Sequence, residues 1–354
     1  MNEILMYIMA FGAILGGADR MLGNRFGLGR RFEEAFRLLG PIALSMVGIV
    51  CLAPLLSAAV GIAAAPVFRV LRMDPAVLGS LLAIDMGGYQ MAMDLAKSPQ
   101  MGRFAGIILS ATFGCTVVFT IPVGLGAIEA ADRPWFTRGI LIGLGTMPVG
   151  MVIAGGMLKM PLGDLLWNCL PVLAVSVLLI WGLMKRPEGM LKLFRKFSEG
   201  IGLLATAGLA LGAAAYMTGK PLLPGMTPLM DAMEIACSIA IVMLGSMPLA
   251  ELCQILLRRP FGWIGRHTGL NAVSTTGLLI GVVSVTPALA MIPRMDRRGK
   301  VVCGAFVVCG ASAFAAHVGF TMSVQPDMVS ALLAAKLVGG LAGVAAALLL
   351  TPKE

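Results

Sequence analysis

The chain has 354 residues, of which 58% are hydrophobic and only 13% are charged, about half the ~25% charged fraction of soluble domains. Its 18 acidic and 27 basic residues are too few to coat a soluble protein of this size. This composition excludes a cytosolic enzyme, a nucleic-acid binder and a disordered protein. The net charge of +9 comes from bases in short connectors between apolar runs, which is typical of the cytoplasmic loops of a polytopic membrane protein.

About eleven apolar segments follow one another, and most reach the ~20 residues needed to cross a bilayer. They cover residues 3–19, 38–66, 75–96, 104–128, 137–158, 163–184, 201–217, 228–257, 269–293, 301–324 and 327–350. Glu3 lies at the start of the first segment and Arg20 follows its end, which is not the charge pattern of a secretory signal peptide. We therefore expect an uncleaved first helix with its N-terminus outside, in an all-α polytopic membrane protein.

An internal repeat links the two halves of the chain. A shift of 197 residues, without a gap, places IALSMVGIVCLA (42–53) on IAIVMLGSMPLA (239–250), with Gly48 on Gly245. The same shift pairs residues in all five segments of each half, although apolar composition alone produces some matches. The predicted organisation is a first membrane repeat (1–160), a linker helix with a basic cytoplasmic loop (161–197) and a second membrane repeat (198–354).

The distribution of Lys and Arg indicates how the segments are arranged. If all eleven segments crossed the membrane, the bases would divide 14 inside to 12 outside, with Lys336 inside the last span. If the third (75–96) and ninth (269–293) segments are broken or re-entrant, the division becomes 20 to 6, the bias expected of cytoplasmic loops. This arrangement inverts the second repeat and places the C-terminus inside. Inverted repeats with broken helices are typical of secondary transporters.

A carboxylate, Asp85, lies in the middle of the third segment. Burying it costs roughly 2.5–3.5 kcal/mol on insertion scales, so such a residue usually pairs with a cation or faces a polar cavity. Gly87 and Gly88 follow and can break the helix, exposing backbone carbonyls. Tyr89 adds an aromatic face and Gln90 a polar side chain. We predict that these residues bind a cationic substrate; the alternative is a structural Asp that pairs with an Arg or caps a half-helix.

The second half offers hydroxyls instead of a second carboxylate. Ser284 and Thr286 lie at the predicted break VVSVTP, and His317 lies in mid-segment, with Thr120 as its repeat partner. Glu234 is the remaining acid that could point inward. The alternative is that the hydroxyls bond their own helix backbone and that the histidine is a packing residue.

Catalytic, metal and cofactor motifs are missing from the sequence. The seven cysteines form no CxxC or Cys/His cluster, so neither a disulfide framework nor a zinc site is indicated. There is no HExxH, no P-loop and no GxSxG with a plausible triad. We therefore expect no enzyme, no catalytic residue, no metal and no cofactor.

Several stretches resemble the ethanolamine-utilisation permease (EutH-like) family. The most specific are LLAIDMGGYQMA and TVVFTIPVGLGAIEAADR, with MNEILMYIMAFGAILGGADRML, RMDRRGKV and HVGF in support. The resemblance runs from end to end. It implies a bacterial inner-membrane permease that admits ethanolamine, often beside a microcompartment pathway, with no enzymatic activity. The chain departs from the family pattern at Ser284-Val285, where an Asn pair is expected, and at Ala316, where an acid is expected.

Ethanolamine carries an ammonium and a hydroxyl, which together match the predicted site. Asp85 would attract the ammonium, and Ser284, Thr286 or His317 would hydrogen-bond the hydroxyl. The expected partners are thus ethanolamine or a related amino alcohol and the lipid bilayer, with no nucleic acid; a homo-oligomer is left open. Two alternatives stay open: a channel-like pore for ammonium or another small cation, and a membrane scaffold or sensor for an amine-catabolic microcompartment.

Overall fold

The structure, a computed structural model, describes residues 2–82 and 85–352, without the side chains at positions 2, 3, 65, 85, 127, 258, 264 and 266. Within these ranges every regular element is helical. In the described part of the chain, eight helices are long and apolar enough to cross a membrane, fewer than the eleven apolar segments predicted from the sequence. The third, ninth and tenth expected segments are not among the eight, because each is interrupted.

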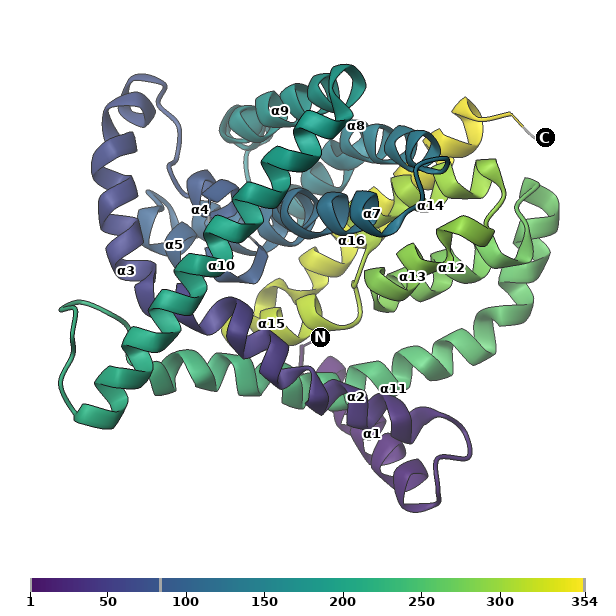
Figure 1. Ribbon diagram of the computed structural model, residues 1–354, viewed down its shortest axis with the longest axis horizontal. Helices are drawn as coiled ribbons and strands as arrows, with labels where there is room; N and C mark the ends of the chain where they lie inside the picture. The colour runs from purple at the N-terminus through teal and green to yellow at the C-terminus, as the bar shows by residue number, and fades with distance from the viewer. Residues whose placement is uncertain (1, 83–84, 353–354) are drawn as a thin grey trace.

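The helices follow one another along both halves of the chain (Figure 1). The first half contains α1 (Asn2–Met21), α2 (Leu28–Arg37), α3 (Leu39–Val70), α4 (Val77–Leu82), η1 (Asp85–Gly87), α5 (Gly88–Leu95), α6 (Pro99–Arg103), η2 (Phe104–Gly114), η3 (Thr116–Thr120), α7 (Ile121–Ala127), α8 (Arg133–Met157) and α9 (Leu162–Lys185). The second half contains α10 (Pro187–Thr218), α11 (Leu229–Thr268), α12 (Ala272–Val283), α13 (Val285–Met291), η4 (Ile292–Arg294), α14 (Arg297–Gly310), α15 (Ala316–Val324), η5 (Pro326–Met328) and α16 (Val329–Leu350).

Two basic connectors, expected as loops, are helical. Helix α10 begins at Pro187, and its basic first third buries Phe194 while Lys192 and Arg195 stay exposed, as in an amphipathic helix. Helix α11 continues through Pro248 and Pro260 to Thr268, and it ends where Gly269 adopts the left-handed conformation (φ 73°). The basic residues of these two connectors therefore lie at the ends of helices and not in loops.

The centre of the molecule is formed by α8, α14, α16 and the helix from Pro99 to Gly126, which lie among the other helices in Figure 1. In the apolar window of that helix 83% of the residues are buried, against only 17% in the apolar window of α10, so α10 belongs to the outer layer. Small residues allow the close contacts at the centre. Gly139 of α8 lies directly against the Val301 carbonyl of α14, and a Cβ there would overlap it.

The central helix is unusual because η2 and η3 are π-helical. In this wider winding the Ser110 hydroxyl donates to the carbonyl of Ala105, five residues earlier, at 3.1 Å. Long π-helical stretches are rare, and π-helical turns are frequent at functional sites. Ser110 therefore lies within a rare backbone form that often marks a functional site.

The contact at Gly139 predicts a stability difference between two glycines of α8. Replacing Gly139 with Ala should destabilise the protein by about 1–3 kcal/mol, because the Cβ forces α8 and α14 apart. Gly145→Ala is the matched control, since nothing lies within 4 Å of its Cβ position and alanine favours helix formation. Thermal unfolding of both variants in detergent measures the difference; equal melting temperatures would contradict the close packing.

Candidate functional site

The third apolar segment is a helical hairpin, with α4 and α5 as its arms. The arms lie against each other, since a Cβ on Gly79 would be 2.5 Å from the backbone nitrogen of Ala92. The Asp74 carboxylate closes the base: it accepts from the backbone N–H groups of Lys97 (3.0 Å) and Ser98 (3.1 Å). The chain therefore enters and leaves this segment at the same place.

The ninth segment is a second hairpin, with α12 and α13 as its arms and Ser284 at the break. Asp296 closes its base by accepting from the backbone N–H of Asn271 at 3.0 Å and from the hydroxyl of Ser274 at 2.6 Å. The Asn271 amide also donates to the Arg294 carbonyl at 3.2 Å. Both hairpins are thus closed by a carboxylate that accepts backbone hydrogen bonds.

The tenth segment, expected to be one helix over 301–324, is interrupted between α14 and α15. Here the backbone is unwound, and Ser312 has a left-handed φ of 54°. The N–H of Ser312 donates to the Gly281 carbonyl at 2.9 Å, and the N–H of Phe314 donates to the Val282 carbonyl at 3.2 Å. Hydrogen bonds to the tip of the second hairpin thus replace those of a continuous helix, which corrects the sequence prediction.

The tip of the first hairpin meets the same interruption from the other side. His317, at the start of α15, is buried and has its Nδ1 3.3 Å from the Ser312 carbonyl. A narrow space of about 160 Å³, too narrow for a water molecule, lies among the surrounding side chains. It is bordered by Met86, Gly106, Ile107, Ser110, Ala111, His317, Phe320 and Thr321.

Tyr89 connects the first hairpin to the second half of the chain. Its ring packs edge-on against Phe320, with ring centroids 5.7 Å apart, and closely approaches Gly106. Its hydroxyl donates to Oε1 of Gln325 at 3.1 Å. Gln325 donates to Asp327, which forms an ion pair with Arg103 at 3.1 Å. An aromatic contact with Phe320, which borders the narrow space, and a chain of polar contacts thus link the first hairpin to the second half of the chain.

The sequence-predicted residues do not all lie together. Gly87, Gly88, Tyr89 and His317 lie at or beside the meeting point of the hairpin tip and the interruption, and Ser284 is half-buried at the break of the second hairpin. The backbone of Asp85 begins η1, directly before Met86. Its side chain lies outside the described residues, so its position relative to this site stays a prediction.

The other predicted residues have different surroundings. Gln90 donates to Asp94 at 2.8 Å, on the part of α5 that faces α3. Thr286 and Glu234 are exposed, the latter on α11. Thr120 is fully buried, and its hydroxyl has no hydrogen-bond partner among the described residues.

Sequence reasoning overlooked Lys336 as a site residue and treated it only as a charge in the last span. Its side chain is 1% exposed, and its Nζ donates to the Ala111 carbonyl at 2.8 Å. Ala111 borders the narrow space. A single base within the apolar run of α16 was the available signal, since an ionisable residue in a span is by default a functional candidate.

The arrangement has the features of a polytopic membrane protein with a polar centre. Two hairpin tips and an interrupted helix bring backbone carbonyls, hydroxyls and a histidine into a helix bundle with many apolar spans. Such irregular backbone at depth is tolerated where it is covered by protein or lines a cavity. No group of three or more potential metal ligands occurs among the described side chains.

Comparison with known proteins identifies the family. The profile of the family described as "Ethanolamine utilisation protein, EutH" matches residues 1–350. A "Probable ethanolamine permease EutH" of Listeria monocytogenes is 39% identical over 97% of this chain and 92% of the relative. The Escherichia coli protein of the same name is 34% identical over 100% of this chain and 96% of the relative. The "Uncharacterized protein YxeR" of Bacillus subtilis is 38% identical over the same shares. No solved structure matches the chain.

The chain belongs to the EutH family, which confirms the resemblance found in the sequence. The relatives from Listeria monocytogenes and Escherichia coli are named as probable permeases, a class of membrane transporters rather than enzymes. The absence of catalytic motifs from the sequence agrees with this class.

The carboxylate at the base of the first hairpin predicts a specific sensitivity. Asp74→Asn should destabilise the protein by about 1–3 kcal/mol, because an amide accepts fewer of the backbone hydrogen bonds that the carboxylate accepts. Glu199→Gln, an exposed acid on α10, is the control for charge. Thermal unfolding in detergent compares the two, and an unchanged melting temperature for Asp74→Asn would show that the base is held by other contacts.

Proposed function

We propose that this protein is a permease for ethanolamine or a closely related small amino alcohol. The observation that carries the proposal is the meeting of two hairpin tips at an interrupted helix, within a family whose named relatives are ethanolamine permeases. Discontinuous helices near the centre of a bundle are how secondary transporters form substrate and ion sites.

The chemistry of ethanolamine fits the groups gathered there. Its ammonium needs a carboxylate or several carbonyl oxygens to replace water, which Asp85 and the backbone breaks supply. Tyr89 provides an aromatic face for the cation. The substrate hydroxyl would bond to Ser284 or His317. Thr286 is exposed beside the same break, and Thr120 is buried. In this proposal both hydroxyls contact the substrate only after the helices shift.

Several features of the packing fit two five-segment repeats around a linker. The repeats cover residues 1–160 and 198–354, and the linker covers residues 161–197. A shift of 197 places Asp74 on Asn271, the residues at the two hairpin bases. It also places Gly48 on Gly245. Gly48 of α3 lies against the α10 backbone, whereas Gly245 of α11 lies against the α1 backbone. Helix α1 thus contacts α11, and α10 contacts α3, an exchange expected of two repeats related by a two-fold axis.

The narrowness of the central space favours a carrier over an open pore. The space beside His317 excludes water in this structure, which is the occluded arrangement that a carrier needs between its open states. In a carrier the two repeats move against each other and open the site to one side at a time. The channel-like pore and the microcompartment scaffold are alternatives that transport measurements distinguish.

The central prediction concerns Asp85. Asp85→Asn should abolish uptake of radiolabelled ethanolamine into proteoliposomes without loss of folded protein, because the amide no longer attracts the ammonium. Glu199→Gln should transport as the wild type does. Uptake by Asp85→Asn at the wild-type rate would refute the proposed role of Asp85 in binding the ammonium.

The kinetics of uptake separate the alternatives. A permease should show saturable uptake that is competed by close analogues and not by ammonium at equal concentration. Uptake that rises linearly with concentration would indicate a pore, and unimpaired ethanolamine transport in cells lacking the protein would indicate a scaffold or sensor. Imposed Na⁺ and pH gradients in the same proteoliposomes identify the coupling ion.

The inverted arrangement predicts that the two hairpin bases lie on opposite sides of the membrane. In a cysteine-free background, Gln100→Cys and Arg294→Cys place exposed thiols beside the first and second base. A membrane-impermeant thiol reagent should label the first from outside and the second from the cytoplasmic side only. Labelling of both from one side would refute the inversion.

A further inference from the structure

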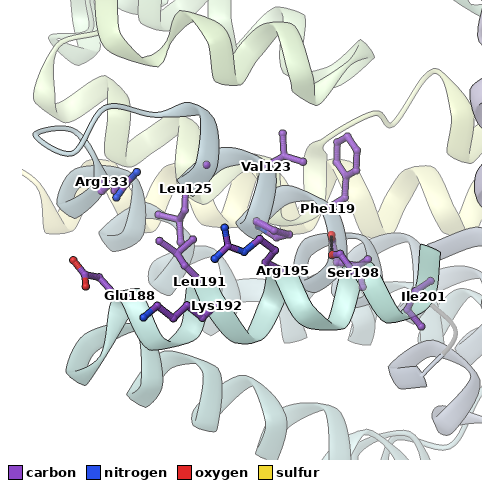
Figure 2. A pocket seen from close by; sticks show the side chains of 13 residues that line it. Phe119, Val123, Leu125, Arg133, Glu188, Leu191, Lys192, Arg195, Ser198 and Ile201 are labelled. Carbon is purple, nitrogen blue, oxygen red and sulfur yellow. Dashed lines mark hydrogen bonds between the residues drawn. The ribbon is translucent and has the colours of Figure 1, made fainter. Parts of the chain in front are cut away.

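A second cavity lies apart from the hairpin tips, between α10 and the segment formed by η3 and α7 (Figure 2). Its volume is about 700 Å³, far larger than the narrow space beside His317. One wall is the basic first third of α10, and the other comes from residues 118–126, with Arg133 of α8 at one end. The proposed transport site uses none of these side chains.

The charges in this cavity are predominantly positive. Arg133, Lys192 and Arg195 border it with one acid, Glu188. Among the described residues, neither Lys192 nor Arg195 forms an ion pair or hydrogen bond with the protein. Arg133 uses its Nε to donate to the Ile128 carbonyl at 3.3 Å. Three basic side chains thus border the cavity against one acid, and Glu188 forms no ion pair with Lys192 or Arg195 among the described residues.

The apolar part of the cavity lies at the other end. In Figure 2, Glu188, Lys192 and Arg133 lie toward one end, Arg195 lies in the middle, and Phe119 and Ile201 lie toward the opposite end. The same gradient is present in α10, whose charged first third is followed by an apolar stretch long enough to cross a membrane. The cavity therefore lies where a membrane helix passes from its charged end into its apolar part.

We propose that this cavity binds an acidic phospholipid, with its phosphate between Lys192, Arg195 and Arg133 and its acyl chain along Phe119 and Ile201. Basic pockets between membrane helices recognise anionic lipid head groups through this combination. A soluble phosphate compound would satisfy the bases but leave the apolar end in contact with water. A zwitterionic lipid would fill the apolar end but present a choline or ethanolamine cation to the bases.

A lipid bound here connects the linker region to the first repeat. One wall belongs to α10 and the other to α7, and α7 contacts α13 of the second hairpin through Gly124 and Leu289. The bound lipid would therefore stabilise the position of α7 on α10 in the folded protein.

The test uses the full-length protein, purified in detergent and delipidated. Added phosphatidylglycerol should raise its melting temperature saturably, while phosphatidylcholine should give little shift at equal concentration. Lys192→Gln with Arg195→Gln should weaken the apparent affinity for phosphatidylglycerol about 25-fold, since each base near an anionic lipid is worth about a factor of five. If the double variant does not fold, Arg195→Gln alone should weaken it about 5-fold.

The matched control removes the same charge elsewhere. Lys185→Gln with Lys196→Gln changes two exposed bases that do not border the cavity, and it should bind phosphatidylglycerol as the wild type does. Equal losses in both double variants would overturn the site, because they would show general attraction to a basic surface. Glycerol phosphate that binds as tightly as the lipid would also overturn it, in favour of a soluble phosphate ligand. Equal increases in melting temperature with phosphatidylglycerol and phosphatidylcholine would also overturn the proposal, because Lys192 and Arg195 would then not select the acidic lipid.

Discussion

The hydrogen bonds that close the two hairpin bases are the constraint on which the centre of this protein depends. Asp74 accepts backbone N–H groups from both ends of the first hairpin, whereas Asp296, at the end of the second, accepts from Asn271 at its start and from Gly299 in the first turn of α14. Charge-assisted bonds of this kind are stronger than neutral ones. Because the two ends of each hairpin are held together, the short arms α4 and α13 keep the hairpin tips at a defined depth in the protein. Neither arm is long enough to cross a bilayer.

The interruption between α14 and α15 is a consequence of the second hairpin. The tip of α12 has carbonyl groups without helical partners, and the unwound backbone at Ser312 and Phe314 supplies the donors. Each break thus supplies hydrogen-bond partners to the other, as buried backbone groups require. The same interruption positions His317 beside the first hairpin tip, and the two halves of the chain therefore meet at one place.

Much of the fold could be predicted from the sequence, because long apolar runs and the positions of the Lys and Arg residues are direct consequences of the bilayer. The glycines after Asp85 and Pro287 after Ser284 marked the two hairpin breaks. The break at residues 311–315 could not be predicted, since alanines and a serine do not stop a helix unless another segment offers hydrogen bonds. The sequence could not show that Gln90 donates to Asp94 or that Glu234 is exposed, since both depend on how α5 and α11 pack.

The sequence by itself determined that this is a helical membrane protein of the EutH family with few, localised charges. It did so because composition, hydropathy and motif identity are properties of the chain alone. Only the tertiary structure decided that Lys336 is buried against Ala111 beside the narrow space, and that α10 and α7 enclose a basic cavity. These features depend on contacts between residues far apart in the chain, and a linear pattern does not specify which helix faces another.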